Sequence, residues 1–110
     1  MKRSAEHDAQ AAWRMLGLAA RAGRIAAGVE MIRSRISRNQ VYLIWLAADA
    51  GPTSKKRIRY LASQSQLPLI EQGSSAELGH WTGRSQCAAV ALLDQQMAAR
   101  VIELAAKDHV

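Results

Sequence analysis

The stretch VYLIWLAAD, residues 41–49, is apolar up to its last residue and rich in residue types that favour β-strands. A run of this kind is typical of a strand that is covered on both faces, as in a parallel sheet. It is far too short to cross a bilayer, which takes about 20 apolar residues. We therefore predict that residues 41–49 form the central strand of a buried sheet.

The segments on either side of this strand alternate between helical and extended patterns. Apolar residues at helical spacing indicate helices, and short apolar runs between turn residues indicate strands. The predicted strands are residues 24–28, 41–49, 67–73 and 87–94, and the predicted helices are residues 5–22, 29–38, a segment that begins near residue 52, 74–83 and 94–107.

Residues that favour helix ends support these boundaries. Pro52 is favoured at a first helical position, and Ser74 with Glu77 three residues later fits a capping box. Gly83 is a typical helix stop, and the carboxylate of Asp94 can cap the last helix. Each predicted strand is therefore separated from the next by a helix.

Strands alternating with single helices place helices on both faces of a sheet. We predict an α/β fold, a three-layer α/β/α sandwich with a mixed four-stranded sheet. Residues 1–110 should form one domain, with residues 1–10 flexible. In open sheets binding sites gather in loops at one end of the strands. The loops of interest are residues 23–28, 49–54 and 73–83.

The charge is unevenly placed along the chain. Residues 14–59 carry ten Lys or Arg against two acids, whereas residues 60–110 carry three against five, and the formal net charge is +6. This asymmetry predicts one basic face, and the usual partner of a basic face is a polyanion. We favour nucleic acid over an anionic membrane.

The amino terminus and the single cysteine indicate the compartment. MKRSAEHDAQ lacks the apolar core of a secretory signal, so we expect a soluble, cytoplasmic protein. Cys87 lies in the apolar run CAAVALL and excludes an intramolecular disulfide. A buried structural thiol is the favoured interpretation.

Enzymatic motifs are not found. Gly23 and Gly28 have the glycine spacing of a phosphate-binding loop, but Val29 and Glu30 follow where that motif needs Lys and then Ser or Thr. We expect no enzyme activity, no cofactor and no metal.

The histidines and Asp49 do not change this expectation. His7, His80 and His109 are scattered without metal-ligand spacing. His80 is the best placed of the three, but no acidic or thiol partner is predicted near it. Asp49 lies at the end of the central strand. Its side chain is more often expected there to orient the turn and cap the next helix than to act as an acid or base.

Two predicted helices carry the basic residues. On a helical wheel for residues 29–38, Glu30, Arg33, Ser34 and Ser37 share the polar face beside an apolar stripe. The helix after residue 52 presents Lys55, Lys56 and Arg59 away from its own apolar stripe. An ordinary solvated face with a Glu30–Arg33 pair, worth a few tenths of a kcal/mol, remains an open alternative.

Four segments carry a resemblance to a known family. LGLAARAGRIAAGVEMIRSRI, LIWLAADAGPTSKKRI, LPLIEQGSSAELGHWTG and CAAVALLD follow, in order and spacing, the pattern of the kink-turn RNA-binding family. That family includes archaeal ribosomal protein L7Ae and small bacterial homologues, and the match runs from about residue 13 to residue 106. The resemblance implies a non-catalytic protein that binds structured or kinked RNA and associates with the ribosome. The sequence leaves the oligomeric state open, although nothing in it requires more than a monomer.

The resemblance also implies a site, formed by the turn and helix at Gly28–Arg35 and by the loop at Ser74–Gly83. Glu30 would accept hydrogen bonds from guanine while basic neighbours hold phosphates. Leu78 and Gly79 would pack against flipped-out nucleotides, and Arg21 is a further candidate for phosphate contact. The residues implied to contact RNA are Arg24, Gly28, Val29, Glu30, Arg33, Ser34, Lys55, Leu78, Gly79 and Arg84.

The family signature Gly-x-Asn-Glu-x-x-Lys is altered in this chain. Glu30 stands at the asparagine place, Met31 at the glutamate place and Ser34 at the lysine place. An alternative function is therefore a protein-interaction module on the same fold that has lost kink-turn recognition. Trp81 would stack on a base if exposed, although a core role is favoured.

Overall fold

Helices and strands alternate along the whole chain. The computed structural model describes the backbone of residues 2–107 and the side chains of residues 10–106. The elements are α1 (Lys2–Arg21), β1 (Ile25–Ala27), α2 (Val29–Ser37), β2 (Leu43–Leu46), α3 (Pro52–Gln64), β3 (Leu69–Glu71), α4 (Ser75–Thr82), β4 (Ala89–Leu92) and α5 (Gln95–Lys107). The predicted order is confirmed. Helix α1 begins at Lys2, so the structure gives residues 2–10 as helix.

The four strands form one mixed sheet in the order β1-β4-β2-β3. Strand β2 runs parallel to β3 and antiparallel to β4, which is also antiparallel to β1. Leu46 at the end of β2 pairs with Ala89 on one side and Glu71 on the other. The mixed sheet and the interior position of β2 are confirmed. The apolar run of β2 suggested parallel neighbours on both sides. This is correct for β3 and wrong for β4, which pairs with β2 in the antiparallel direction.

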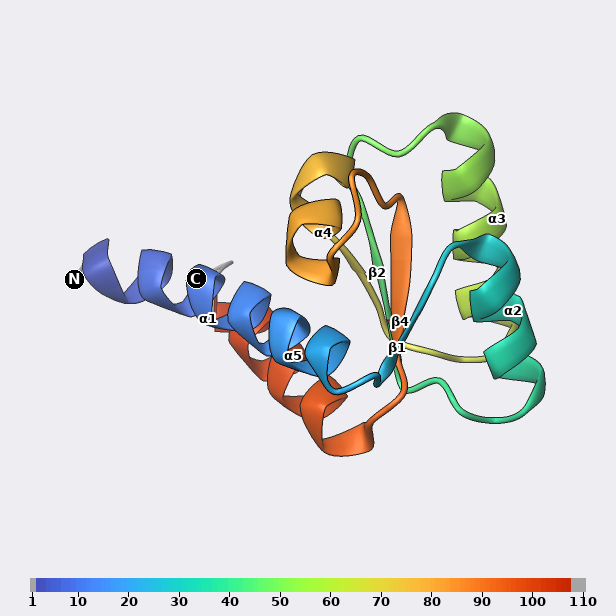
Figure 1. The fold of residues 1–110 in the computed structure, drawn as a ribbon, viewed down its shortest axis with the longest axis horizontal. Coiled ribbons are helices and arrows are strands. Elements are labelled where there is room, and N and C mark those ends of the chain that lie inside the picture. Colours follow the sequence, from blue (N-terminus) through green and yellow to red (C-terminus); the bar gives the residue numbers. More distant parts are fainter. Residues whose placement is uncertain (1, 108–110) are drawn as a thin grey trace.

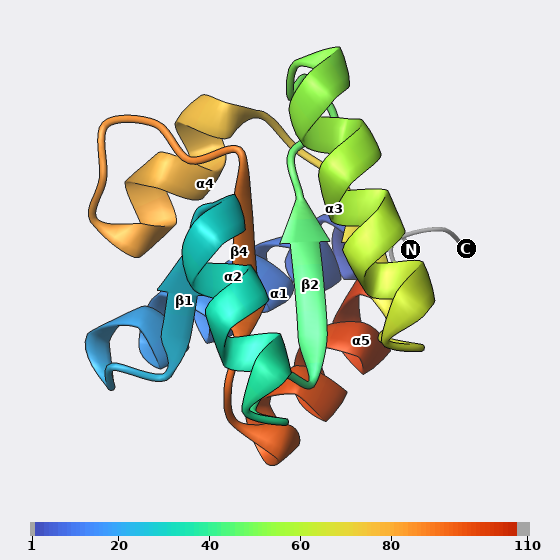
Figure 2. The same cartoon turned by 90° about the vertical axis from the view of Figure 1, so that its right-hand side faces the viewer.

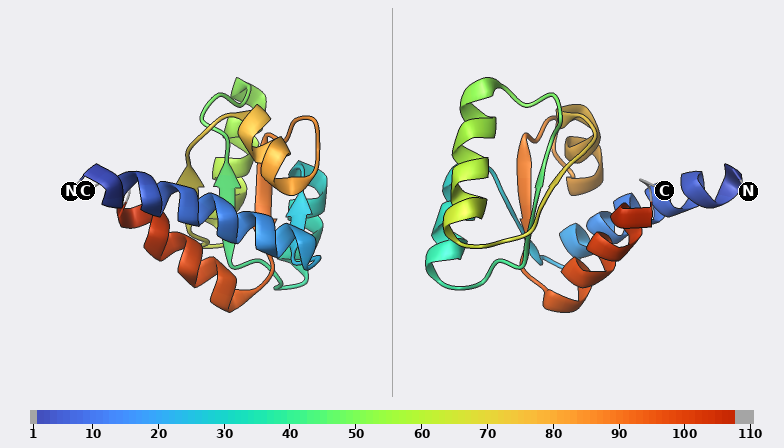
Figure 3. Two further views of the ribbon diagram at one scale, coloured as in Figure 1. Left: turned by 60° about the vertical axis from the view of Figure 1, so that its left-hand side comes forward. Right: turned by 180° about the vertical axis from the view of Figure 1, so that it is seen from behind.

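Helices cover both faces of the sheet. Helices α2 and α3 lie on one face, and α1, α4 and α5 lie on the other (Figure 1). The same two helix layers are seen from two further sides in Figure 3. The α/β/α sandwich is therefore confirmed.

The core fills the space between these layers. All four residues of β2 and of β4 are buried. The helices add Leu16 from α1, Ile32 from α2, Ile58 from α3 and Val101 from α5, each with no exposed surface. Every layer therefore contributes to one continuous core.

Three tryptophans link the helix layer of α1 and α4 to the sheet. Trp45 of β2 is fully buried, and its indole N–H donates to the carbonyl oxygen of Gln72 at 3.0 Å. The ring of Trp13 lies 4.4 Å from that of Trp45, and the ring of Trp81 stacks on Trp13 at 6.4 Å. Trp81 is partly buried and packs against the core. Its predicted core role is confirmed.

The local helix signals are also confirmed. Ser74 Oγ accepts the N–H of Glu77 at 3.0 Å, and Glu77 Oε1 accepts the N–H of Ser74 at 2.9 Å. Gly83 ends α4 with a φ of 78°, and Asp94 Oδ1 accepts the N–H of Met97 at 2.9 Å. These three helix ends are fixed by partners that lie close in sequence.

Cys87 is buried, as predicted for a structural thiol. Burial raises the pKa of its thiol above the ordinary value. Within residues 2–107, no helix is both long enough and apolar enough to span a membrane.

Candidate functional site

Three chain segments meet at one end of the sheet. The N–H of Gly28, after β1, donates to Ala89 at 3.0 Å, and the N–H of Ala47, after β2, donates to Ala88 at 2.8 Å. Because β4 is antiparallel to both strands, its first residues lie where theirs end. We call this region the loop end: Gly28, residues 48–51 and residues 83–88. It is the upper end in Figure 2, where α2 and α3 begin.

Both helices that begin at the loop end start after a glycine. Gly28 precedes α2 and Gly51 precedes α3, and neither helix has a side-chain cap. The φ of 90° at Gly28 favours glycine, because other residues are strained there. The first-turn N–H groups of α2 therefore keep their partial positive charge free for an anion from outside the chain.

An exposed ion-pair cluster lies on the first turn of α2. Glu30 Oε1 is 3.3 Å from Arg33, and Glu30 Oε2 is 3.1 Å from Arg57 of α3. The side chain of Glu30 is 71% exposed, and those of Arg33 and Arg57 are 53% and 46% exposed. The predicted Glu30–Arg33 pair is confirmed. The contact with Arg57 was missed, because 27 residues separate it from Glu30.

This ion-pair cluster contributes little to the stability of the fold, and its charged groups stay accessible to a binding partner. Exposed ion pairs contribute about 0–1 kcal/mol, because solvent screens them and ordering long side chains costs entropy. A carboxylate has about four lone-pair sites. Glu30 can therefore accept further hydrogen bonds while two guanidinium groups stay beside it.

Cations also surround the start of α3. A shallow hollow of about 420 Å³ is lined by Ala50, Pro52, Lys55, Lys56 and Arg59. Arg59 forms a forked pair with Glu71, at 2.7 and 2.8 Å, which lowers the pKa of Glu71 and raises that of Arg59. Lys55 and Lys56 take part in none of the four ion pairs among the described residues. Their charges are available to an anionic partner.

Leu78 and Gly79 support the loop between α4 and β4 from inside. Leu78 has no exposed surface, and Gly79 is buried. A Cβ on Gly79 would lie 2.7 Å from the carbonyl oxygen of Arg84 and 2.8 Å from Cα of Gln86. The expectation that Leu78 and Gly79 present an apolar surface to nucleotides needs correction. The exposed part of this loop is residues 83–86, including Arg84.

Asp49 caps a different helix from the one expected. Its Oδ1 accepts hydrogen bonds from the N–H and the Oγ of Ser75, at 2.8 and 3.0 Å, at the start of α4. Helix α3, which follows Asp49 in the chain, has no side-chain cap. Asp49 therefore ties the loop after β2 to α4 and helps to fix the loop end.

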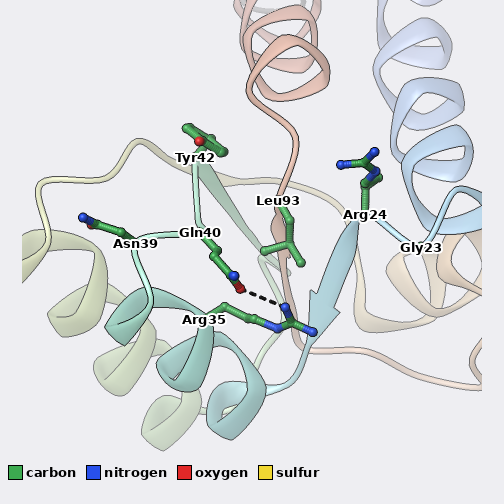
Figure 4. Close-up of a pocket in the computed structure, with 7 residues that line it drawn as sticks. All are labelled: Gly23, Arg24, Arg35, Asn39, Gln40, Tyr42 and Leu93. Atoms are coloured by element: carbon green, nitrogen blue, oxygen red, sulfur yellow. Dashed lines mark hydrogen bonds between the residues drawn. The ribbon is translucent and has the colours of Figure 1, made fainter.

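The structure places Arg24 away from this cluster. Arg24 precedes β1 and Gly28 follows it, so the strand separates them. Arg24 instead lines a hollow with Arg35 at the other end of α2 (Figure 4). Arg21 is exposed at the end of α1. Val29 and Ser34 of α2 are only partly exposed.

The part of the chain that the structure describes contains no cluster of side chains suited to bind a metal ion. No set of three or more His, Cys, Asp or Glu side chains there could hold a metal. His80 is exposed and meets the ring of Trp81 edge-on at 5.3 Å. The side chain of His7 and the whole of His109 lie outside the described residues.

Known proteins share both the sequence pattern and the fold. A family model described as the ribosomal protein L7Ae/L30e/S12e/Gadd45 family matches residues 10–102. The RNA-binding protein YlxQ of Enterococcus faecium is 30% identical over 79 residues, which cover 72% of this chain and 77% of that protein. The RNA-binding protein YlxQ of Bacillus subtilis (strain 168) is 29% identical over 90 residues, covering 82% and 90%.

Two solved structures are similar. A protein of unknown function from Bacillus halodurans C superposes with a TM-score of 0.80 at 28% identity, covering 84% of this chain and 94% of that one. The Giardia lamblia 15.5kD RNA binding protein superposes with a TM-score of 0.77, covering 94% and 88%. The latter is 18% identical, so the likeness is one of fold alone.

Proposed function

We propose that this chain, which belongs to the ribosomal protein L7Ae/L30e/S12e/Gadd45 family, is a non-catalytic protein that binds structured RNA containing a kink. The observation that carries the proposal is the exposed carboxylate of Glu30 between Arg33 and Arg57 at the loop end. The relatives named as RNA-binding proteins support RNA as the partner. The proposed setting is the cytoplasm, as a monomer associated with the ribosome.

Glu30 would recognise a base. The amino and imino groups of guanine donate hydrogen bonds, and a carboxylate is an acceptor with no competing donor of its own. In a Watson–Crick pair the imino group and one amino hydrogen of guanine are bonded to cytosine, so they are not free in a regular duplex. A sheared G·A pair in a kinked RNA leaves them unpaired, in a groove that the kink widens. An acid at this position therefore favours kinked RNA over regular duplex.

The positively charged side chains around Glu30 would bind the phosphate backbone of the RNA. Arg33 and Arg57 flank Glu30, and Lys55 lies at the start of the neighbouring helix. The first-turn N–H groups of α2 add donors for a phosphate oxygen. Arg84 would contact the same RNA from the loop before β4. These contacts supply affinity without regard to sequence, and Glu30 supplies the discrimination.

The test compares a kink-turn RNA with the same RNA whose tandem G·A pairs are replaced by Watson–Crick pairs. Glu30→Ala should lose affinity for the first RNA and not for the second, because one base contact disappears while the phosphate contacts remain. Lys55→Ala should weaken binding to both RNAs and reduce the dependence of affinity on salt.

Glu103 provides a matched control. It is an exposed acid on α5, 57% exposed, and its ion pair with Arg100 has the same spacing of three residues as the pair of Glu30 with Arg33. Helix α5 lies on the opposite face of the sheet from α2 (Figure 1). Glu103→Ala should leave both affinities unchanged. Equal losses on both RNAs from Glu30→Ala would contradict a base-recognising role for Glu30.

A further inference from the structure

A second hollow lies at the carboxyl-terminal end of α2, away from the loop end, and most of the side chains that line it are polar or charged. It has a volume of about 380 Å³ and opens where the start of β1, the end of α2, the start of β2 and the end of β4 come together (Figure 4). The residues that matter for its chemistry are Arg24, Arg35, Asn39, Gln40, Tyr42 and Leu93.

The backbone around the hollow is fixed by hydrogen bonds. The N–H of Gln40 donates to the carbonyl oxygen of Arg35 at 3.0 Å, which turns the chain back at the end of α2. Asn39 makes this turn possible with a φ of 60°, a conformation that asparagine adopts more easily than most residues. On the opposite side, the N–H of Leu93 donates to the carbonyl oxygen of Arg24 at 2.9 Å.

The side chain of Arg35 is also oriented. Its Nη1 donates to Gln40 Oε1 at 2.8 Å, and Figure 4 draws this bond as a dashed line. Leu93 lies between Arg24 on one side and Gln40 and Tyr42 on the other (Figure 4). The hollow therefore presents two guanidinium groups around an apolar residue, with one guanidinium held in place.

The charge of these two arginines is not neutralised within the described part of the chain. Neither Arg24 nor Arg35 takes part in the four ion pairs found there, and no acidic residue lines the hollow. Asp94, which follows Leu93, uses Oδ1 to cap α5 through the N–H of Met97. The hollow is thus suited to an anion, and guanidinium groups match the oxygens of a phosphate.

The remaining residues suit a base. Tyr42 is 39% exposed, so part of its ring is available for stacking. The amides of Asn39 and Gln40 can donate to and accept from the polar edge of a base. The volume lies near the lower end of the range typical of small-molecule sites, which is about 300–1,000 Å³.

We propose that this hollow binds one unpaired nucleotide of an RNA strand, with its phosphate held by Arg24 and Arg35 and its base stacked on Tyr42. The inference rests on the proposed function only in taking RNA as the partner. Helix α2 has nine residues and therefore spans about 13 Å. One RNA molecule can thus contact the loop end and the hollow together.

The first experiment uses a short, labelled, single-stranded oligoribonucleotide that can form neither duplex nor kink. Tyr42→Ala should weaken its binding about fivefold or more, because a stacked base is lost, whereas Tyr42→Phe should bind like the unchanged protein. Arg35→Ala should weaken binding and reduce its salt dependence. Thermal unfolding of each variant verifies that it is folded.

Two control variants separate this site from the general basic surface. Arg38 is exposed at the end of α2 and does not line the hollow, and Tyr60 of α3 is 63% exposed. Arg38→Ala and Tyr60→Ala should each change the affinity by less than about twofold. Losses equal to those of Arg35→Ala and Tyr42→Ala would overturn the proposal. So would tighter binding of a glutamate-rich peptide than of the oligonucleotide, which would indicate a protein partner.

The same variants distinguish the hollow from the loop end. Tyr42→Ala should leave binding of a blunt-ended kink-turn RNA unchanged, because the unpaired nucleotides of its kink lie at the loop end, about 13 Å from the hollow, and it has no unpaired tail that could reach the hollow. Glu30→Ala should leave oligonucleotide binding unchanged. If Glu30→Ala does not change the ratio of affinities for kink-turn RNA and its Watson–Crick control, while Tyr42→Ala weakens oligonucleotide binding, the proposed function is wrong and the nucleotide site in the hollow is supported. If Glu30→Ala changes that ratio and Tyr42→Ala has no effect on oligonucleotide binding, the nucleotide site is wrong and the proposed function is supported.

Discussion

Gly79→Ala tests the way in which the loop before β4 is held at the loop end. Gly79 lies inside α4, where alanine is normally the better helix former by about 0.5–1 kcal/mol. Helix propensity alone therefore predicts a more stable protein. The structure predicts the opposite, because the space for the new methyl group is already occupied.

The expected cost follows from the surroundings of Gly79. An added Cβ would lie 2.7 Å from the carbonyl oxygen of Arg84, 2.8 Å from Cα of Gln86 and 2.9 Å from its nitrogen. All three are backbone atoms, so the loop itself must move. Overpacking of this kind costs about 1–3 kcal/mol. The shift also strains the 2.7 Å hydrogen bond from the N–H of Arg84 to Gly79, worth about 1 kcal/mol.

After subtraction of the helix-propensity gain, we expect a net destabilisation of about 1–3 kcal/mol. For a chain of this size, each kcal/mol lowers the midpoint of thermal unfolding by about 4 °C. Gly51→Ala is the matched control, since a Cβ there meets nothing within 4 Å and the φ of −62° suits alanine. That variant should stay within about 0.5 kcal/mol of the unchanged protein, because a slightly poorer helix cap is offset by a less flexible unfolded chain.

The assay is thermal unfolding followed by circular dichroism, together with titration of kink-turn RNA. Gly79→Ala should unfold at a lower temperature and bind RNA less tightly, because Arg84 moves with the loop. An unchanged or higher unfolding temperature would refute the reasoning, since it would mean that residues 84–86 do not depend on close packing against Gly79.

Three further predictions concern the loop end and its surroundings. Met31→Glu, at a residue that is 48% exposed, should increase affinity for kink-turn RNA over its Watson–Crick control, and an unchanged ratio would argue against base recognition there. Because Arg59 lowers the pKa of Glu71 in the folded state, the pair stabilises the protein above the unfolded-state pKa of about 4.3, and this contribution disappears as the pH falls through the lower folded-state value. The unfolding temperatures of Glu71→Gln and the unchanged protein should therefore converge in acid, and a constant difference would contradict the assignment. Asp49→Ala should destabilise the protein by about 1–2 kcal/mol in chemical denaturation, because the N–H of Ser75 loses its acceptor, and no change would show that solvent replaces it.

Local signals in the sequence predicted local structure well. The capping box at Ser74 and Glu77, and the cap at Asp94, depend on partners three residues away, so the chain brings them together in any fold that contains these helices. Strand lengths were overestimated for a related reason. Val41 is buried like the residues of β2 but lies outside it, since burial does not require a place in the hydrogen-bond ladder.

The site could be predicted only in part, because its geometry depends on contacts distant in sequence. Arg24 and Gly28 are four residues apart, yet the intervening strand carries them to opposite ends of the sheet. Arg57 reaches Glu30 from another helix, and nothing near either residue indicates this contact. Gly79 was predicted to lie on the surface. In the structure it is buried, and the absence of a side chain lets the backbone of residues 84–86 pack against it.

The most direct test of the central proposal is a titration of the unchanged protein against a kink-turn RNA and against the same RNA with its G·A pairs replaced by Watson–Crick pairs, each at two salt concentrations. We expect tight binding to the first RNA and a large loss on the second at both salt concentrations, because Glu30 recognises groups that only the kinked RNA exposes. Equal, strongly salt-sensitive binding to both RNAs would contradict the proposal, since phosphate contacts alone would then account for the affinity.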